Sequence, residues 1–310
     1  MVVDIEIYKT GNGVLIKHGG RRIAIDRVPR NIAADLYLVS HAHTDHLPPA
    51  SGLRVIASDE TIRLAKSRGY NYVKLDVDKY RDIEMIDSGH ILGSKSFLID
   101  GKILYTGDIN TFNRGFLKGF KPPQADILII EATYGYYKYV FGRYNELLSR
   151  LKTIISRELM NGISIILKAY PLGKLQILSE ILRGFRNLYV SRHVYKYNVI
   201  YHELGVLNDP GKEYLSDIKD PIILLESSVS RDTVKPSTQA ITIRLSGWMV
   251  GREDEGLPLS DHADFTELLR TVDRVSPKKI YTIYGFADKL AEILRSMGYS
   301  AEPLSRISNL

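Results

Sequence analysis

The spacing of hydrophobic and polar residues divides the chain into three stretches. Through about residue 135, short runs of apolar and β-branched residues alternate with turn residues. This pattern predicts strands at 2–7, 14–17, 22–25, 35–39, 72–75, 83–87, 96–99, 102–105 and 126–130. A helix is expected from Asp59 to Arg68, and the glycines of Gly11-Asn-Gly13 and Gly19-Gly20 predict hairpin turns. So many short strands indicate a layered sheet domain.

The middle stretch, from Tyr134 to about Arg244, has a different pattern. Helical periodicity over 144–160 places its apolar residues on one side. Predicted strands at 163–168, 188–190 and 222–225 alternate with predicted helices at 172–183 and 194–205. Such alternation is typical of a small parallel α/β unit.

After Arg244 the first pattern returns. It predicts a strand near 240–245, a helix at 264–274, a strand at 279–283 and a last helix at 286–297. We therefore expect a discontinuous first domain of residues 1–135 and 245–310, and a domain of residues 136–244 inserted into it.

Charge is unevenly distributed between these stretches. The net charge is +6, and residues 136–245 hold 16 Lys and Arg against 10 Asp and Glu, whereas the rest of the chain balances at 26 against 26. A basic module favours a polyanionic partner such as nucleic acid, although solvated surface charge would give the same balance. The sequence contains no cysteine, so disulfides are excluded and any zinc site must use His and carboxylates. We see no membrane-spanning run and no signal peptide, and expect a cytoplasmic protein.

A group of metal-ligand residues follows the strand predicted at 35–39. In His41-Ala-His43-Thr-Asp45-His46, His41 and His43 project to the same side of an extended backbone and can bind one ion. If the chain turns after them, Asp45 and His46 can reach a second ion. The alternative is a polar loop whose histidines are incidental.

Two further candidate ligands lie at predicted strand ends. His90 stands in Asp87-Ser-Gly-His90-Ile-Leu-Gly-Ser94, and Asp108 closes Tyr105-Thr-Gly-Asp108. Loops at strand ends commonly carry functional groups. Each residue alone would be interpreted as an ordinary loop or turn residue.

The order of these motifs resembles the metallo-β-lactamase superfamily. Glu131-Ala-Thr-Tyr-Gly135 resembles the acidic motif that opens its β-CASP branch, and Pro258-Leu-Ser-Asp-His262-Ala-Asp264 resembles the histidine motif that closes the inserted cassette. The segments 167–176 and 246–249 resemble the ligase-associated DNA exonucleases and the archaeal mRNA 3′-end processing factor-like proteins. The resemblance covers nearly the whole chain. It implies an α/β fold: a metallo-β-lactamase αββα sandwich with an inserted small parallel α/β (β-CASP) domain.

The resemblance also implies roles for individual residues. One Zn²⁺ would be held by His41, His43 and His90, and a second by Asp45 and His46. Asp108 would bridge both ions, and Mn²⁺ is a possible substitute for zinc. Asp45 would thereby be required for catalysis, while His262 would protonate the leaving 3′-oxygen and Glu131 would orient it. Without the resemblance, His262 would be interpreted as a surface histidine near a helix start.

At two further positions the resemblance leaves alternatives open. Asp35 matches the family's first motif and would orient a ligand loop, although a turn carboxylate is an equal alternative. Tyr284 stands where most of the subgroup carries a histidine ligand of the second zinc. A neutral phenol is a poor zinc ligand, so Tyr284 either packs or reaches bound water or phosphate with its hydroxyl. In both cases we expect the second metal to be held weakly.

Contacts with nucleic acid are expected in the inserted domain. Tyr136, Lys138 and Arg143 follow the acidic motif, and Lys174 opens a predicted helix after a strand. Basic groups bind phosphates and aromatic rings stack on unpaired bases, but core tyrosines would give the same pattern.

These features favour a zinc-dependent nuclease. The leading hypothesis is a DNA exonuclease of DNA repair or processing, associated with repair or ligase machinery. The alternative is an RNA nuclease of the 3′-end processing type. A hydrolase of small esters is disfavoured because such enzymes of this fold lack Glu131 and His262. A non-catalytic nucleic-acid-binding protein is the last alternative, suggested by Tyr284.

Overall fold

The structure is a computed structural model, and it describes residues 5–216, 218–230 and 235–305. It divides into two compact units. Unit 1 comprises 1–111, 119–137 and 265–310, whereas unit 2 comprises 112–118 and 138–264. Each unit has its own hydrophobic core and is described by itself.

Unit 1 is built around two principal sheets. The first has the order β1 (Glu6–Thr10), β2 (Asn12–His18), β3 (Arg21–Arg27) and β4 (Leu36–Leu38), with β4 parallel to β3 and the other pairs antiparallel. The second has the order β18 (Ala301–Pro303), β17 (Lys279–Ile283), β10 (Ile127–Glu131), β9 (Ile103–Tyr105), β8 (Lys95–Ile99) and β7 (Ile83–Asp87). Strands β18 to β9 run parallel to one another, and β7 and β8 are antiparallel additions at one edge.

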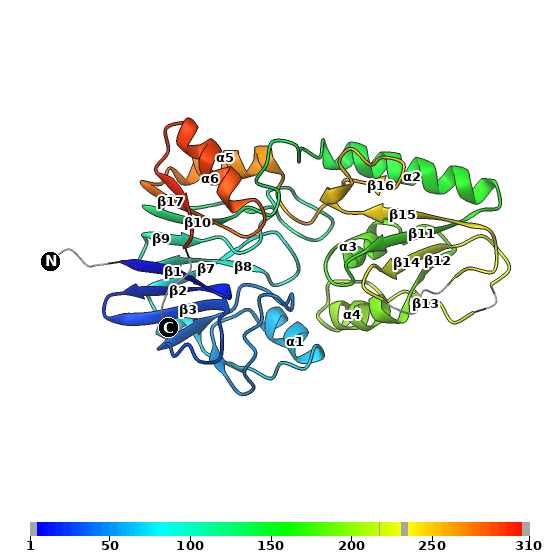
Figure 1. Ribbon diagram of the computed structural model, residues 1–310. Helices are drawn as coiled ribbons and strands as arrows, with labels where there is room; N and C mark the ends of the chain where they lie inside the picture. Colours follow the sequence, from blue (N-terminus) through cyan, green and yellow to red (C-terminus); the bar gives the residue numbers. More distant parts are fainter. Residues whose placement is uncertain (1–4, 217, 231–234, 306–310) are drawn as a thin grey trace. The chain divides into compact units, whose positions relative to one another are not determined.

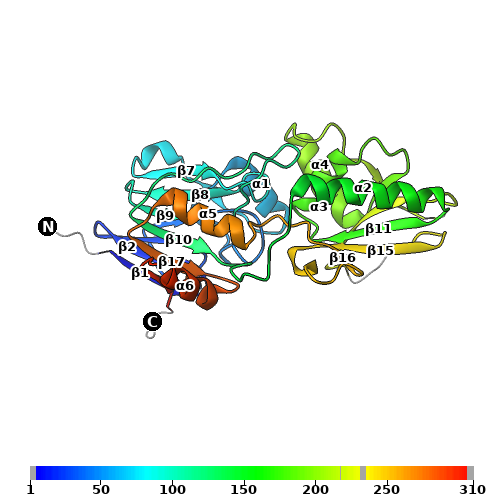
Figure 2. The ribbon, with the colours of Figure 1, turned by 90° about the horizontal axis from the view of Figure 1, so that it is seen from above.

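The two sheets pack face to face because their apolar residues alternate toward a shared core. Ile16 and Ile25 of the first sheet and Phe97 and Ile129 of the second belong to one buried cluster. Helix α1 (Asp59–Ser67) lies outside the first sheet, and α5 (Phe265–Val275) and α6 (Ala287–Ser296) lie outside the second (Figures 1 and 2). A short pair, β5 (Arg54–Val55) and β6 (Val73–Lys74), and a 3₁₀ turn, η1 (Val77–Lys79), complete the unit.

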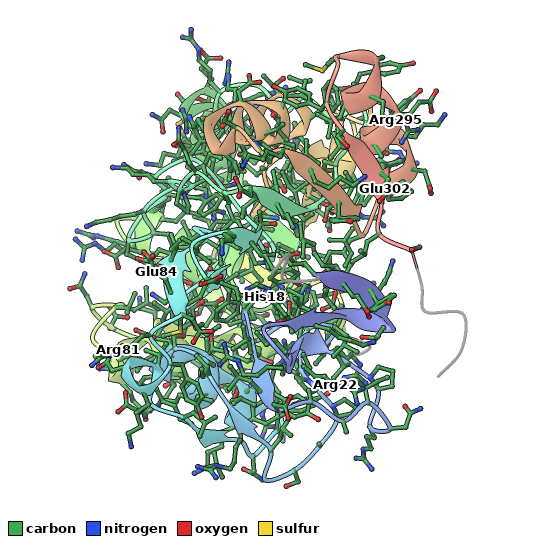
Figure 3. All side chains as sticks on the ribbon, turned by 90° about the vertical axis from the view of Figure 1, so that its left-hand side faces the viewer. His18, Arg22, Arg81, Glu84, Arg295 and Glu302 are labelled. Carbon is green, nitrogen blue, oxygen red and sulfur yellow. The ribbon has the colours of Figure 1, made fainter. Side chains whose placement is uncertain are left out.

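Ion pairs also join the two sheets of unit 1. At the end of β2, His18 Nε2 lies 3.1 Å from Asp100 Oδ2 in the turn between β8 and β9. Arg21 of β3 pairs with Asp82, next to β7. Figure 3, in which His18, Arg22 and Glu84 are labelled, shows this side of the unit.

Unit 2 is a parallel sheet with helices. The sheet order is β13 (Lys212–Glu213), β12 (Leu188–Val190), β14 (Ile223–Ser227), β11 (Ser164–Ala169), β15 (Ala240–Leu245) and β16 (Gly256–Leu257). All of its pairings are parallel. The helices are α2 (Tyr144–Met160), α3 (Lys174–Ile181) and α4 (Arg192–Glu203), and η2 (Gly247–Met249) is a 3₁₀ turn. Residues of all three helices share one buried cluster with the sheet, which is why the predicted periodicity holds.

The fold class predicted from the sequence is confirmed: an αββα sandwich carries an inserted parallel α/β unit. The insertion ends later than the predicted boundary at 244, because β15 pairs with β11 and β16 pairs with β15 inside the sheet of unit 2. Residues 112–118 also join unit 2, which the sequence pattern did not suggest. The predicted strand 2–7 begins outside the described residues, and β1 covers 6–10 instead. None of the described helices could span a membrane.

Candidate metal centre

Four of the predicted metal ligands meet in unit 1. His41 and His43 follow β4, His90 lies between β7 and β8, and Asp108 follows β9. One ligand atom from each residue lies within 4.8 Å of the others. His41, His90 and Asp108 are buried, so packing restrains these three side chains.

The spacing of the ligand atoms fits a small metal ion. Two nitrogens bound to one tetrahedral zinc would be about 3.3 Å apart, given zinc–nitrogen bonds of about 2.0–2.1 Å. His90 Nε2 lies 3.2 Å from His43 Nδ1, and Asp108 Oδ2 lies 3.4 Å from His41 Nε2 and 3.5 Å from His90 Nε2. These groups can therefore surround one ion.

A second set of ligands shares the same aspartate. The backbone turns after His43, whose carbonyl accepts a hydrogen bond from the amide of His46 at 3.0 Å. His46 Nε2 then lies 3.4 Å from Asp108 Oδ2 and 3.8 Å from Asp45 Oδ2. Asp108 Oδ2 thus faces imidazoles of both sets, as a carboxylate that bridges two ions would.

The close approach of these loops depends on Gly107. Its φ is +57°, and a Cβ at this position would lie 3.0 Å from the Cβ of Ser40, next to His41. A side chain would have to displace the first histidine loop. The glycine therefore lets Asp108 lie beside the histidines.

Asp26, at the end of β3, organises the second set, and the sequence analysis did not single it out. Its Oδ2 accepts hydrogen bonds from His46 Nδ1 at 2.8 Å, Ser40 Oγ at 2.8 Å and the Tyr105 hydroxyl at 2.6 Å. Its Oδ1 accepts from the Ser40 amide at 2.7 Å. Because Asp26 holds Nδ1 of His46, Nε2 is directed to the metal position.

Asp35, which was expected to orient a ligand loop, is exposed and accepts a hydrogen bond from the Arg22 amide at 2.7 Å. Among the described residues, Asp35 hydrogen-bonds Arg22 rather than a ligand loop, whereas Asp26 contacts His46 directly. These contacts favour the turn interpretation of Asp35 and assign the orienting contact to Asp26. One signal in the sequence could have identified Asp26, which directly follows the strand predicted at 22–25. In the structure this strand, β3, pairs with β4, which leads into the histidine motif.

The charges around His46 are strongly coupled. Burial by itself would lower the pKa of His46, but the carboxylates of Asp108 and Asp26 outweigh it and raise the pKa to about 10. In the metal-free protein a proton therefore occupies His46 at neutral pH. A metal ion at this position would have to displace that proton.

The hydroxyl of Tyr284 makes hydrogen bonds that disfavour its binding to a metal ion. Its hydroxyl donates to the carbonyl of Asn12 at 2.8 Å and lies 3.0 Å from the hydroxyl of Tyr105. Burial, the largest cause, and the nearby carboxylate of Asp26 raise its pKa well above the ordinary value, so the phenol stays neutral. Its ring packs edge-on against His46, with the ring centroids 5.3 Å apart. These contacts favour the packing interpretation.

Glu131 is fully buried at the end of β10. Its Oε1 accepts a hydrogen bond from the amide of Ile109 at 2.7 Å, so the carboxylate braces the loop that carries Asp108. His262 belongs to unit 2, shortly before the chain re-enters unit 1 at Phe265. Its side chain is half-buried, and its amide donates to Ser260 Oγ at 3.0 Å.

The expected nucleic-acid contacts divide into exposed and buried groups. Arg143 and Lys138 are exposed, and Tyr136 stacks on Phe286 with ring centroids 5.7 Å apart. Lys174, in contrast, has a side chain only 12% exposed, and its Nζ donates to the Leu245 carbonyl at 3.0 Å. Lys174 is therefore corrected from a phosphate contact to an internal cation, a role that its place at a helix start did not reveal.

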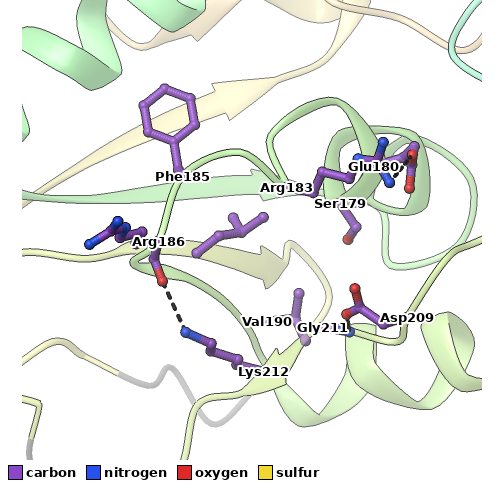
Figure 4. Close-up of a pocket in the computed structure, with 10 residues that line it drawn as sticks. Ser179, Glu180, Arg183, Phe185, Arg186, Val190, Asp209, Gly211 and Lys212 are labelled. Atoms are coloured by element: carbon purple, nitrogen blue, oxygen red, sulfur yellow. Dashed lines mark hydrogen bonds and ion pairs between the residues drawn. The ribbon is translucent and has the colours of Figure 1, made fainter.

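Unit 2 also contains a cavity of about 170 Å³ beside β12 and the end of α3 (Figure 4). Its charged groups already contact neighbours. Arg183 lies 3.3 Å from Glu180, and Lys212 donates to the Arg186 carbonyl at 3.0 Å. These pairings leave the metal centre as the candidate functional site.

Several known proteins have sequences similar to this chain. The "Probable DNA ligase" of Opitutus terrae is 27% identical over 293 residues, which cover 85% of this chain and 28% of the ligase. The "RNase J-like protein" of Methanocaldococcus jannaschii is 30% identical over 189 residues, 49% of this chain and 44% of that protein. The chain resembles the β-CASP branch of the metallo-β-lactamase nucleases.

Two other comparisons concern a shorter sequence match and the fold. "Cleavage and polyadenylation specificity factor subunit 3" of Dictyostelium discoideum is 29% identical over 136 residues, 42% of this chain and 16% of that protein. A crystal structure of a protein of unknown function from Enterococcus faecalis has the same fold, with a TM-score of 0.60, 12% identity and coverage of 92% of this chain and 95% of the other. No family model matches the chain. The chain spans less than half the length of the curated β-CASP relatives named here.

Proposed function

We propose that this protein is a metal-dependent nuclease that hydrolyses phosphodiester bonds of nucleic acid with two zinc ions. The observation that carries the proposal is the convergence of His41, His43, His90 and Asp108, whose ligand atoms lie within 4.8 Å of one another. The first ion would be held by these four residues. The second would be held by Asp45 and His46 with Asp108 shared, and Mn²⁺ could replace zinc.

The residues around the metals have separate tasks in this proposal. When bound, the ions lower the pKa of water and neutralise charge on the phosphate. Asp26 fixes the imidazole of His46, and Glu131 braces the Asp108 loop through the Ile109 amide. His262 donates a proton to the leaving 3′-oxygen, a step that a general acid accelerates by about 10²–10⁴-fold. Glu131 would also orient His262.

Nucleic acid suits the positive charge and the exposed groups of the segment 136–245. The segment 136–245 carries the whole net positive charge of the chain. Arg143 and Lys138 are exposed and can contact phosphates. Tyr136, which precedes them in the sequence and belongs to unit 1, can stack on a base.

DNA is the proposed substrate, and exonucleolytic processing of DNA ends in the cytoplasm, alongside repair or ligase machinery, is the proposed setting. The support is the relative named as a DNA ligase, whose similarity extends over 85% of this chain. An RNA substrate is the second candidate, since the relative named as RNase J-like has the higher identity, 30%, over a shorter segment.

The test is digestion of end-labelled DNA and RNA of identical sequence, single-stranded and duplex, by protein reconstituted with zinc or manganese. We expect stepwise shortening of DNA that a chelator stops. Asp45→Ala and His46→Ala should abolish hydrolysis while nucleic-acid binding, measured by fluorescence anisotropy, persists. Asp59→Ala is the matched control, because Asp59 is an exposed aspartate of the same unit that pairs with Lys74 at 2.7 Å.

The products distinguish the candidates. Shortening of RNA alone would replace the DNA proposal with the RNA one. Near-normal turnover by the Asp45 and His46 variants, or a protein that binds no transition metal after reconstitution, would contradict the proposed chemistry.

A further inference from the structure

The short segment 112–118 belongs to unit 2 although its neighbours in sequence belong to unit 1. It follows the Asp108 loop by only a few residues. Gly115 lies against helix α3: a Cβ there would be 3.2 Å from Ile177 Cγ2. Phe116 packs edge-on against Tyr201 of α4, with ring centroids 5.8 Å apart. The segment is therefore anchored on two helices.

Arg114 lies in this segment and is one of the largest fully buried side chains in the described part of the chain. Its guanidinium donates to Asp261 Oδ1 at 2.8 Å and reaches the carbonyl of Ser260 at 3.4 Å. Lys174 Nζ lies 3.9 Å from the other carboxylate oxygen of Asp261. Asp261 is itself 6% exposed, so one buried carboxylate lies between two largely buried cations.

Such an arrangement fixes the backbone that carries it. A buried ion pair is costly to separate, because each charge would be left without compensation in a medium of low polarity. Arg114 contacts both the carboxylate of Asp261 and the carbonyl of the preceding residue, Ser260. These two contacts together restrain the position and the direction of the backbone at Asp261. The next residue along the chain is His262, whose amide is bonded to Ser260 Oγ.

We propose that Arg114 is a positioning residue for His262. It clamps Ser260 and Asp261, and Lys174 supports the clamp, so that the imidazole of His262 is presented at a fixed place for proton donation. This inference rests on the proposed function, in which His262 is the general acid. The role differs from that of a structural ion pair, because its loss should affect only the step that needs the proton.

The leaving group separates these two roles. An oligonucleotide releases an alkoxide, which needs a proton, whereas bis(p-nitrophenyl) phosphate releases nitrophenolate, a far weaker base that needs none. A general acid therefore matters for the first substrate and little for the second.

The experiment compares kcat on both substrates for Arg114→Gln, His262→Ala and the double variant, each reconstituted with zinc. Because a general acid contributes about 10²–10⁴-fold, Arg114→Gln should lower kcat on the oligonucleotide by about 10- to 100-fold and on the nitrophenyl ester by no more than about twofold. The double variant should be no slower than His262→Ala, since both changes affect the same group. Arg157→Gln is the matched control: it removes an arginine–glutamate pair of α2 in the same unit.

Three outcomes would overturn the inference alone: equal losses on both substrates, effects of Arg114→Gln and His262→Ala that multiply, or no loss on the oligonucleotide. If Arg114→Gln does not fold, Arg114→Lys keeps the charge with a single donor and should show the same dependence on leaving group to a smaller extent. An unsubstituted protein without metal-dependent nuclease activity would overturn the proposed function, and this inference with it.

Discussion

Replacing Asp26 with Asn tests whether the second metal position is built from β3. The substitution keeps the shape of the side chain and removes its charge. The backbone at Asp26 has φ +61°, a conformation that Asn adopts readily, so no strain is added. The effect should therefore arise from the lost charge and the altered hydrogen bonds, not from the backbone.

The magnitude follows from the contacts of the carboxylate. Oδ2 accepts from His46 Nδ1, Ser40 Oγ and the Tyr105 hydroxyl, and Oδ1 accepts from the Ser40 amide. An amide has only one oxygen, so its NH₂ group must face a donor whichever way it is turned. Losing hydrogen bonds to a buried charge, at about 1.5–3 kcal/mol each, should destabilise the metal-free protein by roughly 2–4 kcal/mol.

The second metal should be affected more specifically than the first. Loss of a partner that orients a ligating histidine commonly costs about 10- to 100-fold in metal affinity. Competition titration with a zinc chelator resolves the two binding steps. We expect Asp26→Asn to weaken the second step more than the first. The carboxylate contacts His46 directly, but it reaches the first-site ligand His41 through Ser40, whose Oγ lies 2.9 Å from His41 Nδ1.

Asp35→Asn is the matched control, because Asp35 is exposed and bonds only the Arg22 amide among the contacts described above. It should leave both binding steps as in the unsubstituted protein. The reasoning is refuted if Asp26→Asn binds two zinc ions with normal affinity, or if Asp35→Asn weakens the second step instead.

Two further predictions concern the same region. Tyr284→Phe should retain activity and lose about 1–2 kcal/mol of stability in denaturant titrations. The substitution removes the hydroxyl contacts with Tyr105 and Asn12, while the ring still packs on His46. A loss of turnover with unchanged stability would show instead that the hydroxyl contacts the substrate. The raised pKa of His46 means that protonated His46 stabilises the metal-free fold fully below about pH 6.5, and that this contribution is lost as pH rises through about 10. Because zinc must displace this proton, affinity at the second position should rise with pH up to about 10, with proton release detectable by calorimetry in buffers of different ionisation enthalpy. Binding that does not change with pH would contradict the assignment.

The sequence by itself determined the local features of this protein. Helix α2 covers 144–160 as its periodicity predicted, because one apolar stripe fixes both the type of element and the face it buries. The pair His41 and His43 follows from spacing on extended backbone, and their order with His90 and Asp108 indicated one metal centre. These are properties of neighbouring residues or of motif order, and both are written along the chain.

Only the tertiary structure decided which distant residues meet. Asp26 and His46 are 20 positions apart, and Arg114 and Asp261 are 147 apart, so no periodicity connects them. Strand 240–245 has the same apolar pattern whichever sheet it joins, and its pairing with β11 alone places it in unit 2. Lys174 looked available for phosphate because a basic residue at a helix start is usually solvated, yet the fold places a buried carboxylate beside it. Each of these contacts joins groups that approach one another only when the chain is folded, and therefore no local pattern records them.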